Sequence, residues 1–163
     1  MEHRDTLGQG PEVLPRHAGR RRTLVSDLVE ADLPQPFREA LRCLREKRDA
    51  GARVDAVSDN FAYVWVEKLA KNNASEPAGG WLRLPVAFPH ANPHGLITHE
   101  ALRRAGAGEV TDGHNAGHDM CKPVAAAGGA HYYSWTWENS PPPRTPEDII
   151  GVVQWYERRI RKG

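Results

Sequence analysis

Apolar side chains recur at helical spacing in two segments of the chain, one before its middle and one at its end. In residues 35–50 a single apolar stripe is formed by Phe37, Ala40, Leu41 and Leu44. Pro36 suits the first turn of a helix, and Gly51 suits the residue that follows its end. Arginine and glutamate fill the remaining positions, so the pattern predicts an amphipathic helix over residues 35–50.

The second helical segment, residues 145–160, has clearer boundaries. Thr145 is expected as the N-cap and Pro146 as the first helical residue. The acidic residues Glu147 and Asp148 favour the positive end of the helix dipole. One apolar face is formed by Ile149, Val152, Val153, Tyr156 and Ile160. These features predict a C-terminal helix that packs on the core.

Between the two helices the hydrophobic pattern changes to a period of two, which predicts strands. The expected strands cover residues 53–57, 60–69, 81–88 and 95–98. Both faces of the second strand are apolar, so we expect it to be covered on both sides. We further expect a short helix over residues 99–104 and an irregular region over residues 105–143, which aromatic side chains keep ordered.

The length of 163 residues suits one domain with its own core, and the pattern predicts an α+β fold. Residues 1–22 are expected to form a polar tail, and residues 23–163 the domain. The formal net charge of +1 offers no general attraction to nucleic acid. No apolar run approaches the ~20 residues that cross a bilayer, and the N-terminus lacks a secretory leader. We therefore expect a cytoplasmic protein without nucleic-acid or membrane partners.

The two cysteines differ in their surroundings. Cys43 lies beside the apolar stripe of the first helix, where a small packing residue is expected. Cys121 lies in a polar segment with several glycines, which favours partial exposure of its thiol. In a reducing compartment both are expected as free thiols. Cys121 is therefore the candidate nucleophile.

Residues close to Cys121 in the sequence supply groups that acyl transfer needs. The positively charged or protonatable His114, His118 and Lys122 can favour a thiolate. Asn115 is a neutral donor that can stabilise an oxyanion. A thiolate is nucleophilic, and the thioester that it forms stays reactive toward amines. The segment thus favours a cysteine that carries an acyl group.

The order of these features resembles that of ubiquitin-conjugating (E2) enzymes. A strand ends at Phe88-Pro89 and is followed by a proline-containing loop and another extended piece. A His114-Asn115 pair precedes Cys121, and a region rich in tryptophan and proline precedes the closing helix. The likeness covers roughly residues 34–160 and is greatest to bacterial E2-like proteins found beside E1-like enzymes, ubiquitin-like proteins and JAB-type peptidases. The family's His-Pro-Asn tripeptide is absent, since His114-Asn115 is followed by Ala116.

The resemblance implies a UBC-like fold with an N-terminal helix, an antiparallel meander of about four strands, a long active-site loop and a C-terminal helix. It implies that Cys121 accepts the C-terminal glycyl thioester of a ubiquitin-like protein from an E1-like enzyme and passes it to a target lysine. Asn115 would stabilise the oxyanion, His114 would support the loop, and Asp119 or Glu138 would orient the amine. No metal or organic cofactor is implied, and the operons concerned point to antiviral defence.

Two other functions fit the same residues. The chain can be a non-catalytic module of the same fold that binds a ubiquitin-like protein or another partner. Alternatively, His114, His118 and Cys121 can bind zinc in a hydrolase, with His131 or His99 completing a tetrahedron.

Overall fold

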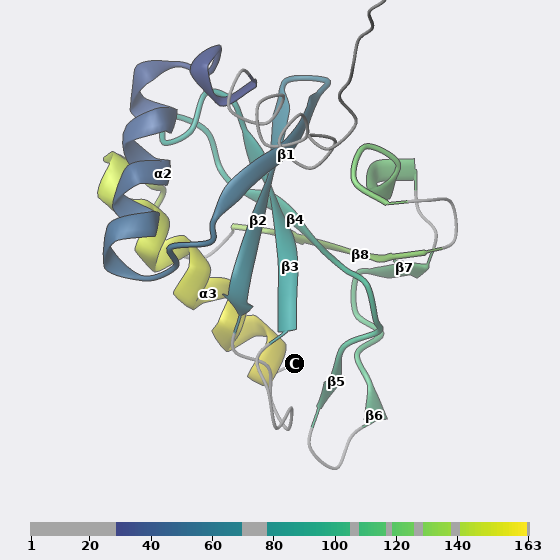
Figure 1. Ribbon diagram of the computed structural model, residues 1–163. Coiled ribbons are helices and arrows are strands. Elements are labelled where there is room, and N and C mark those ends of the chain that lie inside the picture. The colour runs from purple at the N-terminus through teal and green to yellow at the C-terminus, as the bar shows by residue number, and fades with distance from the viewer. Residues whose placement is uncertain are drawn as a thin grey trace, which may run out of the picture.

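A computed structural model describes residues 29–69, 78–104, 108–116, 119–125, 129–137 and 141–162. The predicted tail, residues 1–22, lies outside the described residues, as do His118 and Glu138. The described parts form an α+β fold in which two helices pack on one antiparallel sheet (Figure 1).

The first helix, α2 (Gln35–Lys47), forms where the sequence predicts it, with Pro36 in its first turn. The whole predicted stripe is buried, together with Cys43. The helix ends three residues earlier than expected, where the Arg48 and Asp49 amides both donate to the Leu44 carbonyl. The buried Asp49 carboxylate accepts hydrogen bonds from the amides of Gly51 (3.1 Å) and Lys68 (3.0 Å), which fixes the turn from the helix into the sheet.

The sheet has six strands, not the four predicted, in the order β1-β2-β3-β4-β8-β7. All neighbours are antiparallel. The bounds are β1 (Arg53–Ser58), β2 (Phe61–Leu69), β3 (Ala78–Pro85), β4 (His94–Thr98), β7 (His114–Ala116) and β8 (His131–Thr136). The first four form the predicted meander. A cis Phe88-Pro89 peptide bond lies in the connection between β3 and β4.

The region predicted to be irregular contains the two additional strands. β8 pairs with β4 on one side and with β7 on the other, which extends the sheet beyond the meander (Figure 1). The predicted helix over residues 99–104 is wrong, because β5 (Arg103–Arg104) pairs there with β6 (Gly108–Glu109). The Leu102 amide donates to the Tyr133 hydroxyl at 2.7 Å, and the Leu102 carbonyl accepts from Val110, so these backbone groups bond to distant residues instead of within a helix.

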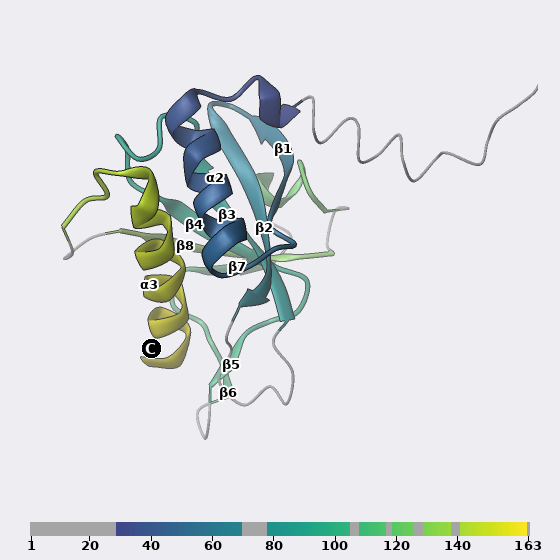
Figure 2. The same cartoon turned by 60° about the vertical axis from the view of Figure 1, so that its left-hand side comes forward.

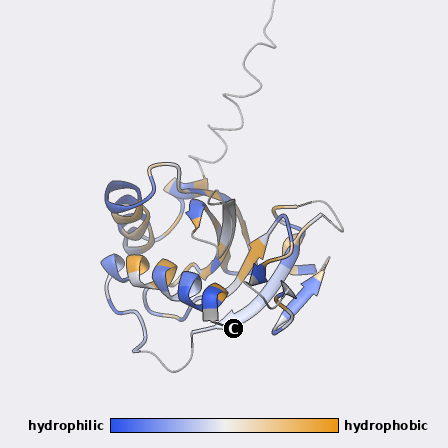
Figure 3. Ribbon diagram, turned by 90° about the horizontal axis from the view of Figure 1, so that it is seen from below, coloured by the Kyte–Doolittle hydropathy of each residue, from blue (hydrophilic) through white to orange (hydrophobic). Residues whose placement is uncertain are grey.

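The two faces of the sheet have separate cores, as the alternation in β2 predicts. Val64 and Val66 face the helices and belong to the larger core, whereas Tyr63 belongs to a smaller cluster on the opposite face. Figure 2 shows α2 and the second helix side by side over the first face. Along the helices, hydrophilic and hydrophobic positions alternate (Figure 3), as expected where one side is buried.

The C-terminal helix α3 (Ile149–Lys162) follows a short 3-10 turn, η3 (Pro146–Asp148). The Asp148 carboxylate accepts hydrogen bonds from the amides of Arg144 (2.6 Å) and Thr145 (2.8 Å), which closes the predicted N-terminus. A largely buried ion pair between Arg48 and Glu157 (2.5 Å) connects the end of α2 to α3. None of the helices in the described ranges is long and apolar enough to span a membrane.

Candidate functional site

Cys121 ends the 3-10 turn η2 (Asp119–Cys121), seen as a green coil beside β7 and β8 in Figure 1. The turn is continued by the amides of Val124 and Ala125, which both donate to the Cys121 carbonyl. The Cys121 side chain is directed at the sheet, on the face away from the helices. There it belongs to a cluster with Tyr63, Trp81, Ile97, Ala130 and Tyr132. We call this group the second-face cluster.

The thiol of Cys121 is buried, so the predicted partial exposure is wrong. Only 3% of the residue is exposed, and burial raises the pKa of the thiol. The glycines and polar residues around it predict an open loop, but Met120 and Val124 pack against the second-face cluster and hold the turn on the sheet. In this arrangement the thiol is therefore neutral at physiological pH.

Lys122 and Asp119 pair with each other on the outer side of the turn. Their side chains form an ion pair at 3.1 Å and are 66% and 82% exposed, respectively. The expectation that Lys122 favours the thiolate is therefore wrong for this arrangement, because desolvation alone sets the direction of the Cys121 pKa.

Asn115 lies on the same face of the sheet as Cys121. On strand β7, Asn115 stands opposite Tyr132 of β8, and directly opposed residues of an antiparallel pair project to one face. Tyr132 is part of the second-face cluster that contains Cys121. The fold therefore brings the two residues predicted to act together onto one face, with Asn115 exposed and Cys121 buried.

His114 projects to the opposite face, because its neighbour Asn115 shares the face of Cys121. Its Nε2 lies 2.8 Å from Nδ1 of His131, and its ring lies 5.1 Å from that of Tyr133, a residue of the larger core. A zinc site that joins His114 to Cys121 does not fit this arrangement. Within the described residues no three His, Cys, Asp or Glu side chains gather closely enough to hold a metal ion.

Arg83 is a buried charge at the site that the sequence analysis did not identify. It is 5% exposed, and its guanidinium donates to the Tyr63 hydroxyl (3.3 Å) and the His94 carbonyl (3.4 Å). The group also lies 3.5 Å from the ring centre of Phe61. Burial, and secondarily the charge of Arg83, lower the pKa of His94. The alternation Leu82-Arg83-Leu84 already places this arginine on the face opposite the helices.

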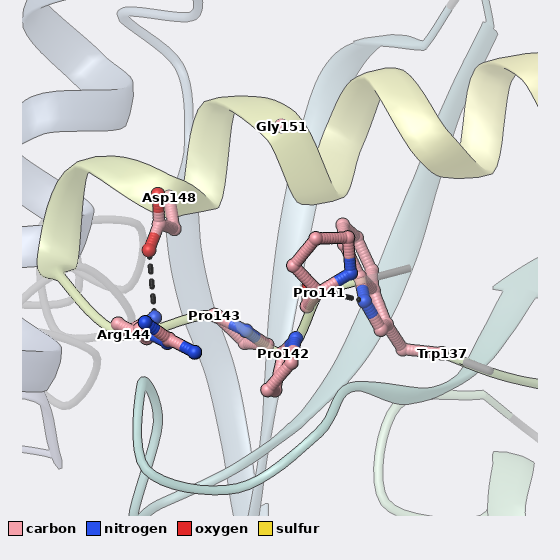
Figure 4. Close-up of a pocket in the computed structure, with 7 residues that line it drawn as sticks. All are labelled: Trp137, Pro141, Pro142, Pro143, Arg144, Asp148 and Gly151. Carbon is pink, nitrogen blue, oxygen red and sulfur yellow. Dashed lines mark hydrogen bonds between the residues drawn. The ribbon is translucent and has the colours of Figure 1, made fainter. Parts of the chain in front are cut away.

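A separate pocket of about 570 Å³ lies at the start of α3 (Figure 4). It is lined by Trp137, Pro141, Pro142, Pro143, Arg144, Asp148 and Gly151. The Trp137 indole donates to the Pro141 carbonyl at 2.8 Å, which holds the proline segment against the ring. None of the described residues predicted to act in catalysis lines this pocket.

Comparison with known proteins adds no relative: no protein family, curated protein or solved structure matches this chain. The site must therefore be interpreted from its own chemistry.

Proposed function

We propose that this chain is an E2-like domain in which Cys121 carries the C-terminal acyl group of a ubiquitin-like protein. The observation that supports it is the placement of Cys121 and Asn115 on the same sheet face, beyond a helix and a four-stranded meander. Asn115 is exposed there, so its amide is available to an incoming carbonyl oxygen.

The proposed reaction has two acyl transfers. The Cys121 sulfur, after losing its proton to solvent, attacks the carbonyl of the E1-bound thioester, and the E1 sulfur leaves as a thiolate. A lysine amine of the target then attacks the Cys121 thioester, loses a proton, and displaces Cys121 as a thiolate. In both steps the tetrahedral oxyanion accepts a hydrogen bond from Asn115, and the exposed Asp119 orients the attacking amine.

The burial of Cys121 adds a requirement to this proposal. A covered, neutral thiol cannot attack a carbonyl, so the turn formed by residues 119–125 must rotate outward when the acyl donor docks. The turn is short, and its outer side chains, Asp119 and Lys122, are exposed. The resting form is accordingly a shielded thiol that resists oxidation and alkylation.

The burial of Cys121 also favours a second candidate function. A non-catalytic E2-like module would keep Cys121 as a packing residue and would bind a ubiquitin-like protein or a partner without forming a thioester. For the carrier, the expected partners are an E1-like enzyme, a ubiquitin-like protein, a target lysine and a JAB-type peptidase of the same operon, in bacterial antiviral defence. The non-catalytic module needs only the ubiquitin-like protein or partner that it binds.

Acyl transfer from a synthetic peptide thioester ending in Gly-Gly separates the two candidates. Intact mass spectrometry would follow the wild type, Cys121→Ser and Cys43→Ser, the last being a matched buried cysteine on α2. A carrier forms one adduct that hydroxylamine removes, retains it in Cys43→Ser and loses it in Cys121→Ser. A binding module forms no adduct, and equal labelling of both cysteines would indicate unspecific thiol exchange and refute the proposal.

A further inference from the structure

The edge strand β7 is attached to the sheet by an unusual side-chain contact. Nε2 of His114 and Nδ1 of His131 lie 2.8 Å apart, and the two rings are nearly coplanar, with centroids 5.0 Å apart and an interplanar angle of 18°. β7 has only three residues, and its single sheet neighbour is β8. The imidazole contact adds to the backbone pairing with β8 and to two bonds just before β7. These are the Ser134 amide to the Gly113 carbonyl (3.0 Å) and the Trp135 indole to the Asp112 carbonyl (2.9 Å).

A hydrogen bond between two imidazole nitrogens depends on the number of protons that the pair carries. One nitrogen must donate and the other must accept, which is satisfied when both rings are neutral or when one is charged. When both rings are protonated, two N–H groups and two positive charges face each other. The contact then changes from attraction to repulsion.

The two carboxylates near the pair, Asp112 and Glu109, each form an ion pair with an arginine. The Tyr133 phenol, whose ring contacts His114, has its pKa raised by burial and stays uncharged in acid. Asp112 is paired with Arg159 of α3 at 3.1 Å, and Glu109 with Arg103 at 3.2 Å. On β4, the residue opposite His131 is Thr98, which is uncharged.

We propose that His114 and His131 form a proton-sensitive clasp that holds β7 on the sheet and releases it when both rings are protonated. Histidine ordinarily changes charge between about pH 5 and 8, which is the range over which release can be tested. β7 carries Asn115 and precedes the turn with Cys121, so release displaces the exposed amide from the second-face cluster. The clasp itself does not require that Cys121 carry an acyl group.

Hydrogen exchange measured between pH 5 and 8, corrected for the intrinsic pH dependence, tests the clasp. In the wild type, protection of residues 114–116 should fall about three- to tenfold toward pH 5, relative to β2 in the same sample. His131→Phe keeps a ring but cannot hydrogen-bond or titrate, so protection should be low at every pH. His131→Gln, whose amide can accept a hydrogen bond without titrating, should remove the pH dependence, whereas His90→Gln should retain it.

Two results would overturn the clasp. One is a wild type whose β7 protection does not change with pH. The other is a pH step of the same size in His131→Gln or His131→Phe, since the titrating group would then lie elsewhere. If His131→Phe fails to fold, which loss of protection in β2 would reveal, His131→Gln still decides the question. No thioester is used, so this test and the acyl-transfer test fail independently.

Discussion

The two faces of the sheet are covered in different ways. On one face, α2 and α3 supply fully buried side chains such as Leu41 and Tyr156, and a buried ion pair joins the helices. On the other face, part of the covering is the short turn of residues 119–125, whose Val124 is half-buried. Burial is the main source of stability, so the helix face carries most of the folding energy. On the face opposite the helices, which contains Cys121, a rearrangement should therefore cost less free energy.

Truncation of one residue on each face tests this difference with the largest expected effect. Leu41→Ala removes a fully buried side chain and should lower the free energy of unfolding by about 2–5 kcal/mol. Val124→Ala on the opposite face should cost less than about 1 kcal/mol, because the residue is already half-exposed. Urea denaturation measures both. Equal losses would show that the faces contribute alike.

Removing a buried hydrogen bond should likewise cost more stability on the helix face than on the opposite face. The buried Tyr156 hydroxyl accepts from the Gly95 amide (3.1 Å) and donates to the Trp135 carbonyl (3.0 Å). Tyr156→Phe leaves both backbone groups without this partner and should cost about 1–3 kcal/mol by thermal or urea denaturation. Tyr63→Phe, the matched change on the second face, should cost under about 1 kcal/mol, because Arg83 keeps other partners. A reversed order would refute the comparison.

The burial of the Cys121 thiol should also make the stability of the protein depend on pH. Because burial raises its pKa, the folded protein holds the thiol proton at a pH where the unfolded chain has released it. The stabilisation from the buried thiol is therefore complete below about pH 8.5 and is lost as the pH rises through the folded pKa. Relative to Cys121→Ala, wild-type stability should fall as the pH rises above about 8.5, and thermal denaturation across a pH series measures the difference.

Alkylation provides a second readout of the same thiol. In a Cys43→Ala background, iodoacetamide should label native Cys121 at least about tenfold more slowly than the urea-unfolded chain. Equal rates would mean that the thiol is exposed in solution.

The smallest expected effect lies at the start of α3, on the helix face. Hydrogen bonds from the amides of Arg144 and Thr145 lower the pKa of Asp148. The stabilisation is therefore present above the usual carboxyl pKa and is lost as the pH falls through the lowered value. Asp148→Asn should cost about 0.3–1 kcal/mol at pH 7 and progressively less as the pH falls through the lowered pKa of Asp148. Glu147→Gln is the control, and an equal loss there would indicate only a general charge effect.

Local patterns predicted the parts of the fold that depend on local physics. Both helices follow from their apolar stripes, and the alternation in β2 correctly assigns its residues to two covered faces. The pairing of β8 with β4 and β7 was missed, because it joins segments far apart in the chain and β7 has only three residues. Residues 99–104 were misassigned for the same reason, since Leu102 bonds to Tyr133 across the sheet.

The sequence proposes which residues belong to the candidate site, but it does not predict how they are arranged. The sequence brought Cys121 and Asn115 together, and the sheet places them on one face. It could not reveal that the turn after β7 docks with the sulfur inward, since docking depends on Val124 and Met120 meeting distant aromatic residues. Nor did it reveal the buried charge of Arg83, which depends on Tyr63 and His94 of neighbouring strands.

Incubation with an E1-like enzyme, its ubiquitin-like protein and ATP tests the proposed carrier function most directly. The account predicts one covalent adduct on Cys121, found by intact mass and peptide mapping, removed by reductant and absent in Cys121→Ser. A complex that forms without any adduct, or an adduct that persists in Cys121→Ser, would contradict it.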